Sequence, residues 1–264
     1  MAGESELSVA YSDLLAEVMR FLGYGADPLA WTDGQKAEAD SYIQAGLRRF
    51  YYPPAAESHE AGYAWSFLNP VTTLATVADQ GEQDLPGDLG RVLGNFHFDA
   101  SVYRRSIVQV SETRMQELRS RTSLSGQPEY CTVRHKPKDA ARGQRFEVAW
   151  WPVPDAAYTL SYRYEAFAGK LSADNPYPLG GMRYAELLIE SCLAVAEQKA
   201  NDQRGLHTAE FERLLAAAIQ HDRRQGARYY GAMGDRPDGP TMLPRRGDTP
   251  GTYQITYNGV DVDA

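Results

Sequence analysis

Two amphipathic patterns open the chain and predict two helices. In the first, apolar residues recur every three or four positions from Ser8 to about Leu22. The second begins at Thr32 with Gln35 three positions later, a pair that forms a capping box, and it ends before Pro53. Because only a short acidic loop separates the two patterns, we expect the helices to form an antiparallel hairpin.

Between residues 63 and 164 the period changes from helical to alternating, which predicts a β-rich region. Clusters of Gly, Pro, Asp and Gln separate short apolar runs, as in an antiparallel sandwich or small barrel. The runs are residues 65–77, 91–98, 106–110, 130–135, 144–151 and 158–164. Within the last two runs, Phe146–Trp150 and Thr159–Tyr164 are expected to pair as a hairpin. A charged stretch, Ser111–Arg121, predicts a short helix among the strands, with Ser111 as its N-cap.

The helical period returns at Met182–Asn201 and again from Thr208 to about Tyr230, which predicts two more helices. Helices that begin and end a domain can share one core while an inserted β module projects from it. We therefore expect an α+β fold: a helical bundle formed by N- and C-terminal helix pairs, an inserted antiparallel β sandwich or barrel-like module, and an extended C-terminal arm. The expected boundaries are 1–60 for the first helices, 61–171 for the β module, 172–230 for the last helices and 231–264 for the arm.

The arm differs from a solvated tail in its last part. Glycine and proline interrupt residues 231–251, but Thr252–Tyr257 alternates β-branched and aromatic residues and predicts a strand. A strand without a mate in its own fold needs a partner sheet, often that of another subunit. The expected partner-binding residues are three in this strand, Tyr253, Ile255 and Tyr257, and three at the end of the last helix, Arg223, Arg224 and Arg228.

Composition is that of a globular protein with a core. Of the 264 residues, 43% are hydrophobic and 23% are charged, and no apolar run is long enough to cross a bilayer. The N-terminus is polar and acidic, so we expect neither a signal peptide nor a membrane partner. Cys131 and Cys192 lie in dissimilar contexts, which favours two buried thiols in a reducing cytoplasm.

Charge is distributed unevenly along the chain. The net charge is −8, yet residues 1–90 hold 14 Asp and Glu against 4 Lys and Arg, while residues 112–146 hold 8 basic against 4 acidic residues. This asymmetry excludes a uniformly basic nucleic-acid-binding surface and permits head-to-tail contacts between unlike faces of neighbouring subunits. The alternative is an ordinary solvated surface with chance clustering.

One basic stretch resembles a strand-binding surface in composition. Its cations alternate with aromatic residues, which together can grip a phosphate backbone. The cations are Arg134, Lys136, Lys138, Arg142 and Arg145, and the aromatic residues are Tyr130, Phe146 and Trp150. A solvated loop tip on a projecting hairpin is the other interpretation.

Catalytic motifs are absent from the sequence. Gly180-Gly181 has no following Lys-Ser or Lys-Thr and therefore does not form a phosphate-binding loop. The five histidines are dispersed, and only His97 and Asp99 share a strand face on which a metal or a general base could sit. Cys192 falls on the apolar stripe of a helix and is expected to be a small core residue. We expect no enzyme activity, no metal and no cofactor.

Several local strings resemble the head–tail connector (adaptor, or head-completion) proteins of tailed bacteriophages, over about residues 8–230. The strings are Arg49-Phe50-Tyr51-Tyr52-Pro53-Pro54, Trp65-Ser66-Phe67-Leu68-Asn69-Pro70, Asp84-Leu85-Pro86-Gly87-Asp88, residues 151–160 and residues 175–181. The resemblance implies a dodecameric ring in the virion neck, assembled in the host cytoplasm. The portal protein would lie above it and a tail or second neck protein below, and genomic DNA would pass through its lumen without specific binding.

Two other functions remain open from the sequence. One is a different phage tail component, such as a tail terminator, baseplate or fibre-attachment protein. The other is a stand-alone domain that binds a carbohydrate or a nucleic acid, for which aromatic residues of the β module would have to line a groove. Those residues are Tyr130, Trp150, Trp151 and Tyr162.

Overall fold

The computed structural model describes residues 5–25, 27–53, 62–99 and 106–225, together with the backbone of residues 255–257 and 260–262. The chain forms two compact units, Met1–Arg223 and Arg224–Ala264. The first unit contains helices and two sheets, so the expected α+β class is confirmed. The finer boundaries near residues 60, 171 and 230 stay predictions.

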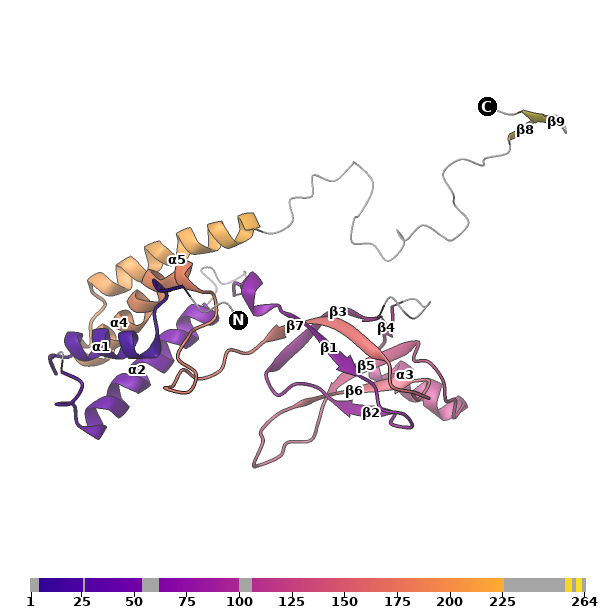
Figure 1. Ribbon diagram of the computed structural model, residues 1–264, viewed down its shortest axis with the longest axis horizontal. Helices are drawn as coiled ribbons and strands as arrows, with labels where there is room; N and C mark the ends of the chain where they lie inside the picture. Colours follow the sequence, from indigo (N-terminus) through magenta and orange to yellow (C-terminus); the bar gives the residue numbers. More distant parts are fainter. Residues whose placement is uncertain are drawn as a thin grey trace. The chain divides into compact units, whose positions relative to one another are not determined.

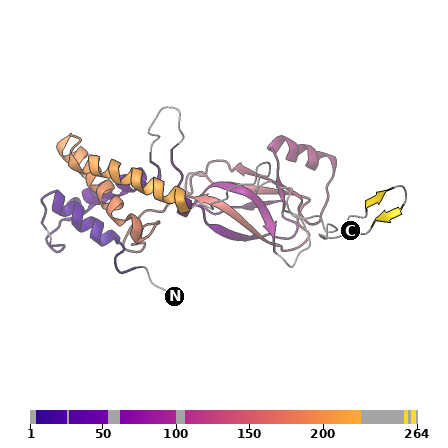
Figure 2. The same ribbon diagram turned by 90° about the horizontal axis from the view of Figure 1, so that it is seen from above.

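All four long helices predicted from the sequence are present, and Figures 1 and 2 show them side by side. They are α1 (Tyr11–Phe21), α2 (Asp33–Tyr51), α4 (Ala185–Asn201), which follows a 3-10 turn at Met182–Tyr184, and α5 (Leu206–Gln225). The capping box holds, because Gln35 N donates to Thr32 Oγ1 at 3.3 Å and Thr32 N donates to Gln35 Oε1 at 2.9 Å. One hydrophobic cluster takes buried residues from all four helices. The predicted end of α5, residues 226–230, lies outside the described residues.

Helices α2 and α4 touch backbone to backbone at one point. A Cβ atom on Gly46 would lie 2.7 Å from Cα of Cys192, a distance that Cβ atoms do not reach in real structures. The Cys192 thiol is fully buried and lies 3.8 Å from the carbonyl oxygen of Ile43. Burial raises the pKa of this thiol to about 12. Cys192 is therefore the small core residue that its place on the helix stripe predicts.

The start of α5 is capped by a carboxylate from α4. Glu197 Oε2 accepts hydrogen bonds from the backbone N–H groups of Gly205 and Thr208, both at 3.1 Å. Burial opposes ionisation of Glu197, but these backbone donors outweigh it and hold its pKa below the ordinary value. A negative side chain at a helix N-terminus also complements the helix dipole. This cap fixes the turn between the two helices.

The β-rich part consists of two sheets that share one core. The three-stranded sheet has the order β1 (Val71–Ala75), β7 (Thr159–Ala166), β3 (Leu89–Phe98), and the four-stranded sheet has the order β2 (Glu82–Asp84), β6 (Phe146–Trp151), β5 (Tyr130–His135), β4 (Val108–Gln109). The expectation of purely antiparallel sheets is wrong for β4, which runs parallel to β5. The reason is the connection between them, which contains α3 (Glu112–Arg121) and supplies the crossover that a parallel pair needs. Ser111 caps α3 as predicted.

The predicted β6–β7 hairpin is wrong, because the two strands belong to different sheets. Strand β6 pairs with β5 and β2, whereas β7 pairs with β1 and β3. The connection begins with Pro152 and contains Pro154, and proline donates no N–H to a ladder. Between the two prolines, the N–H of Val153 donates to the carbonyl oxygen of Leu124 at 2.9 Å, and the N–H of Gly126 donates to the carbonyl oxygen of Val153 at 2.8 Å. Val153 is therefore bonded to the segment before β5 and not to a hairpin partner in β7.

Two of the four aromatic residues proposed for a ligand groove lie in the core of the β part. Trp150 and Tyr162 are 0% and 2% exposed, and both contact the ring of Phe96, with centroids 5.2 and 4.7 Å away. Tyr130 and Trp151 are half-buried and contact each other. A groove that needs all four rings at the surface is therefore excluded.

The second unit contains a β-hairpin. Strand β8 (Ile255–Tyr257) pairs antiparallel with β9 (Val260–Val262), so the predicted strand is confirmed for residues 255–257. The expectation that it has no mate in its own chain is wrong. The sequence signal was Asn258-Gly259 between the two strands, because Asn-Gly favours a two-residue hairpin turn. Tyr253 lies outside the described residues.

Among the helices in the described ranges, none has the length and apolar content needed to cross a membrane.

The α2–α4 contact gives the first test. We predict that Gly46→Ala lowers the free energy of unfolding by about 1–3 kcal/mol, because the new methyl group must push the two helices apart. Gly34→Ala on the same helix is the matched control, since a Cβ there meets nothing within 4 Å, and it should slightly raise stability. Urea unfolding of both variants measures the difference. Equal stability of the two variants would contradict the close contact.

Candidate functional site

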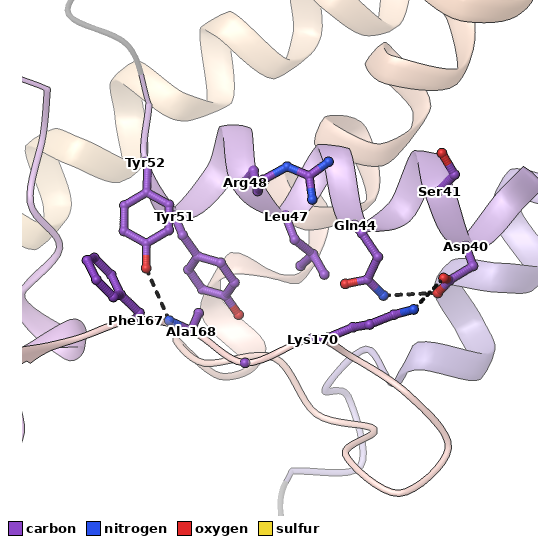
Figure 3. A pocket seen from close by; sticks show the side chains of 11 residues that line it. Asp40, Ser41, Gln44, Leu47, Arg48, Tyr51, Tyr52, Phe167, Ala168 and Lys170 are labelled. Carbon is purple, nitrogen blue, oxygen red and sulfur yellow. Dashed lines mark hydrogen bonds and ion pairs between the residues drawn. The ribbon is translucent and has the colours of Figure 1, made fainter. Parts of the chain in front are cut away.

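A hollow of about 580 Å³ lies between α2 and the segment that follows β7 (Figure 3). Helix α2 and the residue after it contribute Asp40, Ser41, Gln44, Leu47, Arg48, Tyr51 and Tyr52, and the segment contributes Phe167, Ala168, Gly169 and Lys170. The two sides are far apart in sequence and are brought together where the chain returns from the sheets to the helices. None of these residues was singled out from the sequence for a site.

One end of the hollow is organised by Asp40. Its carboxylate accepts hydrogen bonds from Tyr11 Oη at 2.9 Å and Gln44 Nε2 at 3.0 Å, and it pairs with Lys170 Nζ at 2.8 Å. Burial would raise the pKa of Asp40, but the bonds from Lys170, Gln44 and Tyr11 outweigh it and keep this pKa below its ordinary value. Gln44 also donates to the carbonyl oxygen of Leu171 at 2.9 Å. This network ties α1, α2 and the returning segment together.

The other end of the hollow is aromatic and exposed. Tyr52 Oη accepts a hydrogen bond from the backbone N–H of Ala168 at 3.1 Å, and the Tyr52 and Phe167 rings meet edge to face with centroids 6.0 Å apart. Tyr52 remains 39% exposed and Phe167 51% exposed. Figure 3 shows both rings beside the hollow. They are large apolar groups that this chain leaves partly in contact with water.

Arg48 lies between these two ends and is exposed. It forms no ion pair with any carboxylate in the part of the chain that the structure describes. The lining contains no histidine or cysteine, and its one hydroxyl outside the tyrosines is that of Ser41. Asp40 is engaged by Lys170, Tyr11 and Gln44, and a cation beside exposed rings suits the docking of another protein.

A second polar centre fixes the other connection between helices and sheets. Asp222 of α5 is 3% exposed and accepts hydrogen bonds from Tyr63 Oη at 2.7 Å and from the backbone N–H of Ser66 at 2.9 Å. The Ser66 hydroxyl donates to the same carboxylate. Burial opposes the charge, but these donors outweigh it and lower the pKa of Asp222.

In the sequence, the adjacent polar pair His221-Asp222 suggests a solvated helix face, and this interpretation is wrong for Asp222, which is buried. Helical spacing places Asp222 on the inward stripe of α5, because it follows Ala218 by four residues and Phe211 by eleven. A polar residue on such a stripe needs buried donors. Tyr63 and Ser66 supply them, but they lie more than 150 positions away in sequence and could not be identified from it.

The predicted partner-binding residues fall in three places. Arg223 lies beside Asp222 with its guanidinium 5.4 Å from the centre of the Tyr63 ring, and Arg224 is exposed at the end of α5. Ile255 and Tyr257 lie in β8 of the other compact unit. Tyr253 and Arg228 lie outside the described residues. Partner binding by these six residues stays a prediction.

The basic stretch is largely neutralised within the chain. Arg134 pairs with Glu82, Glu112 and Glu147 at 2.6, 2.8 and 2.7 Å. Lys136 and Arg145 both pair with Asp84. The phosphate-gripping interpretation is therefore wrong for these three cations, whereas Lys138 and Arg142 remain exposed.

These pairs also limit the expected contact between unlike faces of neighbouring subunits. Glu82 and Asp84 belong to the acidic first third of the chain, and their partners belong to the basic middle. Part of the charge asymmetry is thus satisfied inside one subunit. Within the described residues, no three His, Cys, Asp or Glu side chains are grouped so as to hold a metal, and His97 and Asp99 are exposed.

A family model matches most of the chain. The family model described as SU10 adaptor protein matches residues 9–236, which is well over half of the chain and includes both the helices and the sheets. This match confirms the resemblance to phage head–tail adaptor proteins. No curated protein matches the chain.

Asp222 gives the second test. At pH 7, Asp222→Asn should lower the free energy of unfolding by about 1–3 kcal/mol, because the buried donors lose a charged acceptor. A carboxyl whose pKa is lowered by folding stabilises the protein above its unfolded pKa of about 4 and loses that contribution as pH falls through the folded pKa. The difference between wild type and variant should therefore shrink below about pH 4.

Urea unfolding between pH 3 and 7 measures this difference. Glu212→Gln, an exposed position on the same helix, is the control and should change little. A constant difference across this pH range would show that Asp222 does not act through its charge.

Proposed function

We propose that this chain, which belongs to the SU10 adaptor protein family, is a structural virion protein that forms a ring at the neck of a tailed bacteriophage. The ring joins the portal vertex to the tail, consists of twelve copies as the resemblance implies, and lets the genome pass through its lumen. The portal protein lies above it, and a tail protein or second neck protein lies below.

The observation that carries this proposal is the extent of the family match. Residues 9–236 include every helix and both sheets of the first unit, so the match is to the whole arrangement and not to one short motif. An adaptor must present surfaces to other proteins, and the hollow on α2 offers exposed rings and a cation, Arg48, that has no ion pair among the described residues.

Electrostatics support a conduit for DNA that does not hold its cargo. Each phosphate that a protein neutralises strengthens binding to DNA. Here the net charge is −8, and Arg134, Lys136 and Arg145 are already paired with carboxylates. Passage of DNA past such a surface meets repulsion and few attractive contacts.

The hairpin in the second unit suits attachment to a neighbouring neck protein. Two strands alone are marginally stable in water, and their outer edges have backbone groups that a further strand can bond. We propose that Ile255–Tyr257 and its mate add to the sheet of a neighbour. Arg223 and Arg224 at the end of α5, together with Arg228 three residues beyond its last residue in the sequence, would meet acidic groups of that neighbour.

A complementation experiment tests the function and the arm separately. Phage unable to make this chain should accumulate DNA-filled heads without tails, and the full-length chain supplied in trans should restore plaques. A chain that stops before Gly231 should fold but give few or no infectious particles. Complete infectious virions without the chain would overturn the proposed function. Normal plaque numbers with the shortened chain would overturn only the role of the arm.

A further inference from the structure

The turn between α1 and α2 presents one leucine almost entirely to solvent. Leu29 is 95% exposed, more than any other large hydrophobic residue in the described part of the chain. The turn itself is held in place: the N–H of Leu29 bonds to Asp27 Oδ1 at 3.0 Å, and the N–H of Ala30 bonds to the Asp27 carbonyl at 3.1 Å. The buried indole of Trp31 donates to Gly25 O at 3.2 Å and anchors the loop.

An exposed apolar side chain on an ordered turn is suited to bind a pocket. Because the turn is already fixed, little conformational freedom is lost when it docks. The carboxylate of Asp27 is exposed beside Leu29, so the turn offers an apolar tip next to a negative charge. A complementary pocket would offer apolar rings next to an unpaired cation.

The hollow on α2 has this composition. Phe167 and Tyr52 provide partly exposed rings, and Arg48 provides a cation without an ion pair among the described residues. Among the other exposed apolar residues, Leu206 and Met182 match it less well, and Leu7 beside Glu6 is the one that the cross-linking control below tests. Leu206 lies two residues from Arg204, and Met182 is followed by Arg183, and these cations would repel Arg48.

The turn and the hollow of one subunit cannot meet. The turn lies before the first residue of α2, Asp33, whereas Arg48 lies near the end of that helix. At a rise of 1.5 Å per residue, about 22 Å of rigid helix separates Asp33 from Arg48. This turn can therefore reach the hollow only from a second copy. A contact between two different surfaces of identical chains is heterologous, which is the kind of contact that closes a ring.

We propose that the Asp27–Leu29 turn of one copy docks in the α2 hollow of the next copy, with Leu29 against Phe167 and Tyr52 and with Asp27 paired to Arg48. This inference rests on the proposed ring and specifies the contact between its subunits.

Cysteine cross-linking tests this contact. Both native cysteines are fully buried and will not compete with engineered ones. Full-length chain with Leu29→Cys and Phe167→Cys is incorporated into particles and oxidised. Because each copy then has one cysteine on each of two different surfaces, a ladder of covalent multimers is expected on a denaturing gel. An equal mixture of the two single variants should give dimers and no longer products.

Matched variants make the result specific. Leu7 is 71% exposed and lies beside Glu6, so Leu7→Cys with Phe167→Cys is the control and should give no ladder. Arg48→Glu should lower the yield of the Leu29–Phe167 ladder by about tenfold, because it places a second negative charge opposite Asp27. Asp27 itself is left unchanged, since its carboxylate holds the turn.

The outcomes separate this contact from the proposed function. If the Leu29 and Phe167 variant enters particles and remains monomeric on the gel, or if only the Leu7 control forms a ladder, the docking is wrong and the adaptor function stands. If the wild-type chain is absent from particles, both proposals are wrong.

Discussion

The backbone contact between Gly46 and Cys192 is the constraint on which the rest of the structure depends. It joins helices from the two ends of the first unit, and the Cys192 thiol reaches the carbonyl of Ile43, 149 positions away in sequence. Only glycine at position 46 permits this approach. Since α2 and α4 are fixed against each other, the sheets between them become an insertion whose two connections must leave from, and return to, one helical core.

Each of those two connections is held by a buried or half-buried carboxylate. Asp222 binds Tyr63 and Ser66 where the chain leaves for the sheets, and Asp40 binds Lys170 where it returns. The hollow on α2 follows from this second attachment, because the returning segment is held beside the helix without filling the space next to Arg48. The attachment of the returning segment to α2 through Asp40 and Lys170 thus both fixes this connection and creates the candidate docking surface.

Local elements of this fold could be predicted from the sequence, and nonlocal pairing could not. The Thr32–Gln35 capping box and the strand Tyr130–His135 match their predictions closely, because periodicity and capping are local properties. Which sheet β7 joins depends on partners far along the chain. Charge counts along the chain likewise could not predict where the charged side chains pair. They did not show that Arg134 pairs with Glu82 and Glu147 within the same subunit. At the α2 hollow, Tyr52 is hydrogen-bonded to Ala168, which lies 116 positions away in sequence, and no local signal predicts that contact.

We propose that this chain forms the ring between portal and tail, and a localised cryo-electron-microscopy reconstruction of the neck of the mature virion is the sharpest experiment. We expect a ring with the twelvefold symmetry of the portal, directly below it, into whose density the α1, α2, α4 and α5 core and the two sheets fit without rearrangement. Density for this fold in a sixfold or threefold part of the tail, or none at the neck, would contradict it.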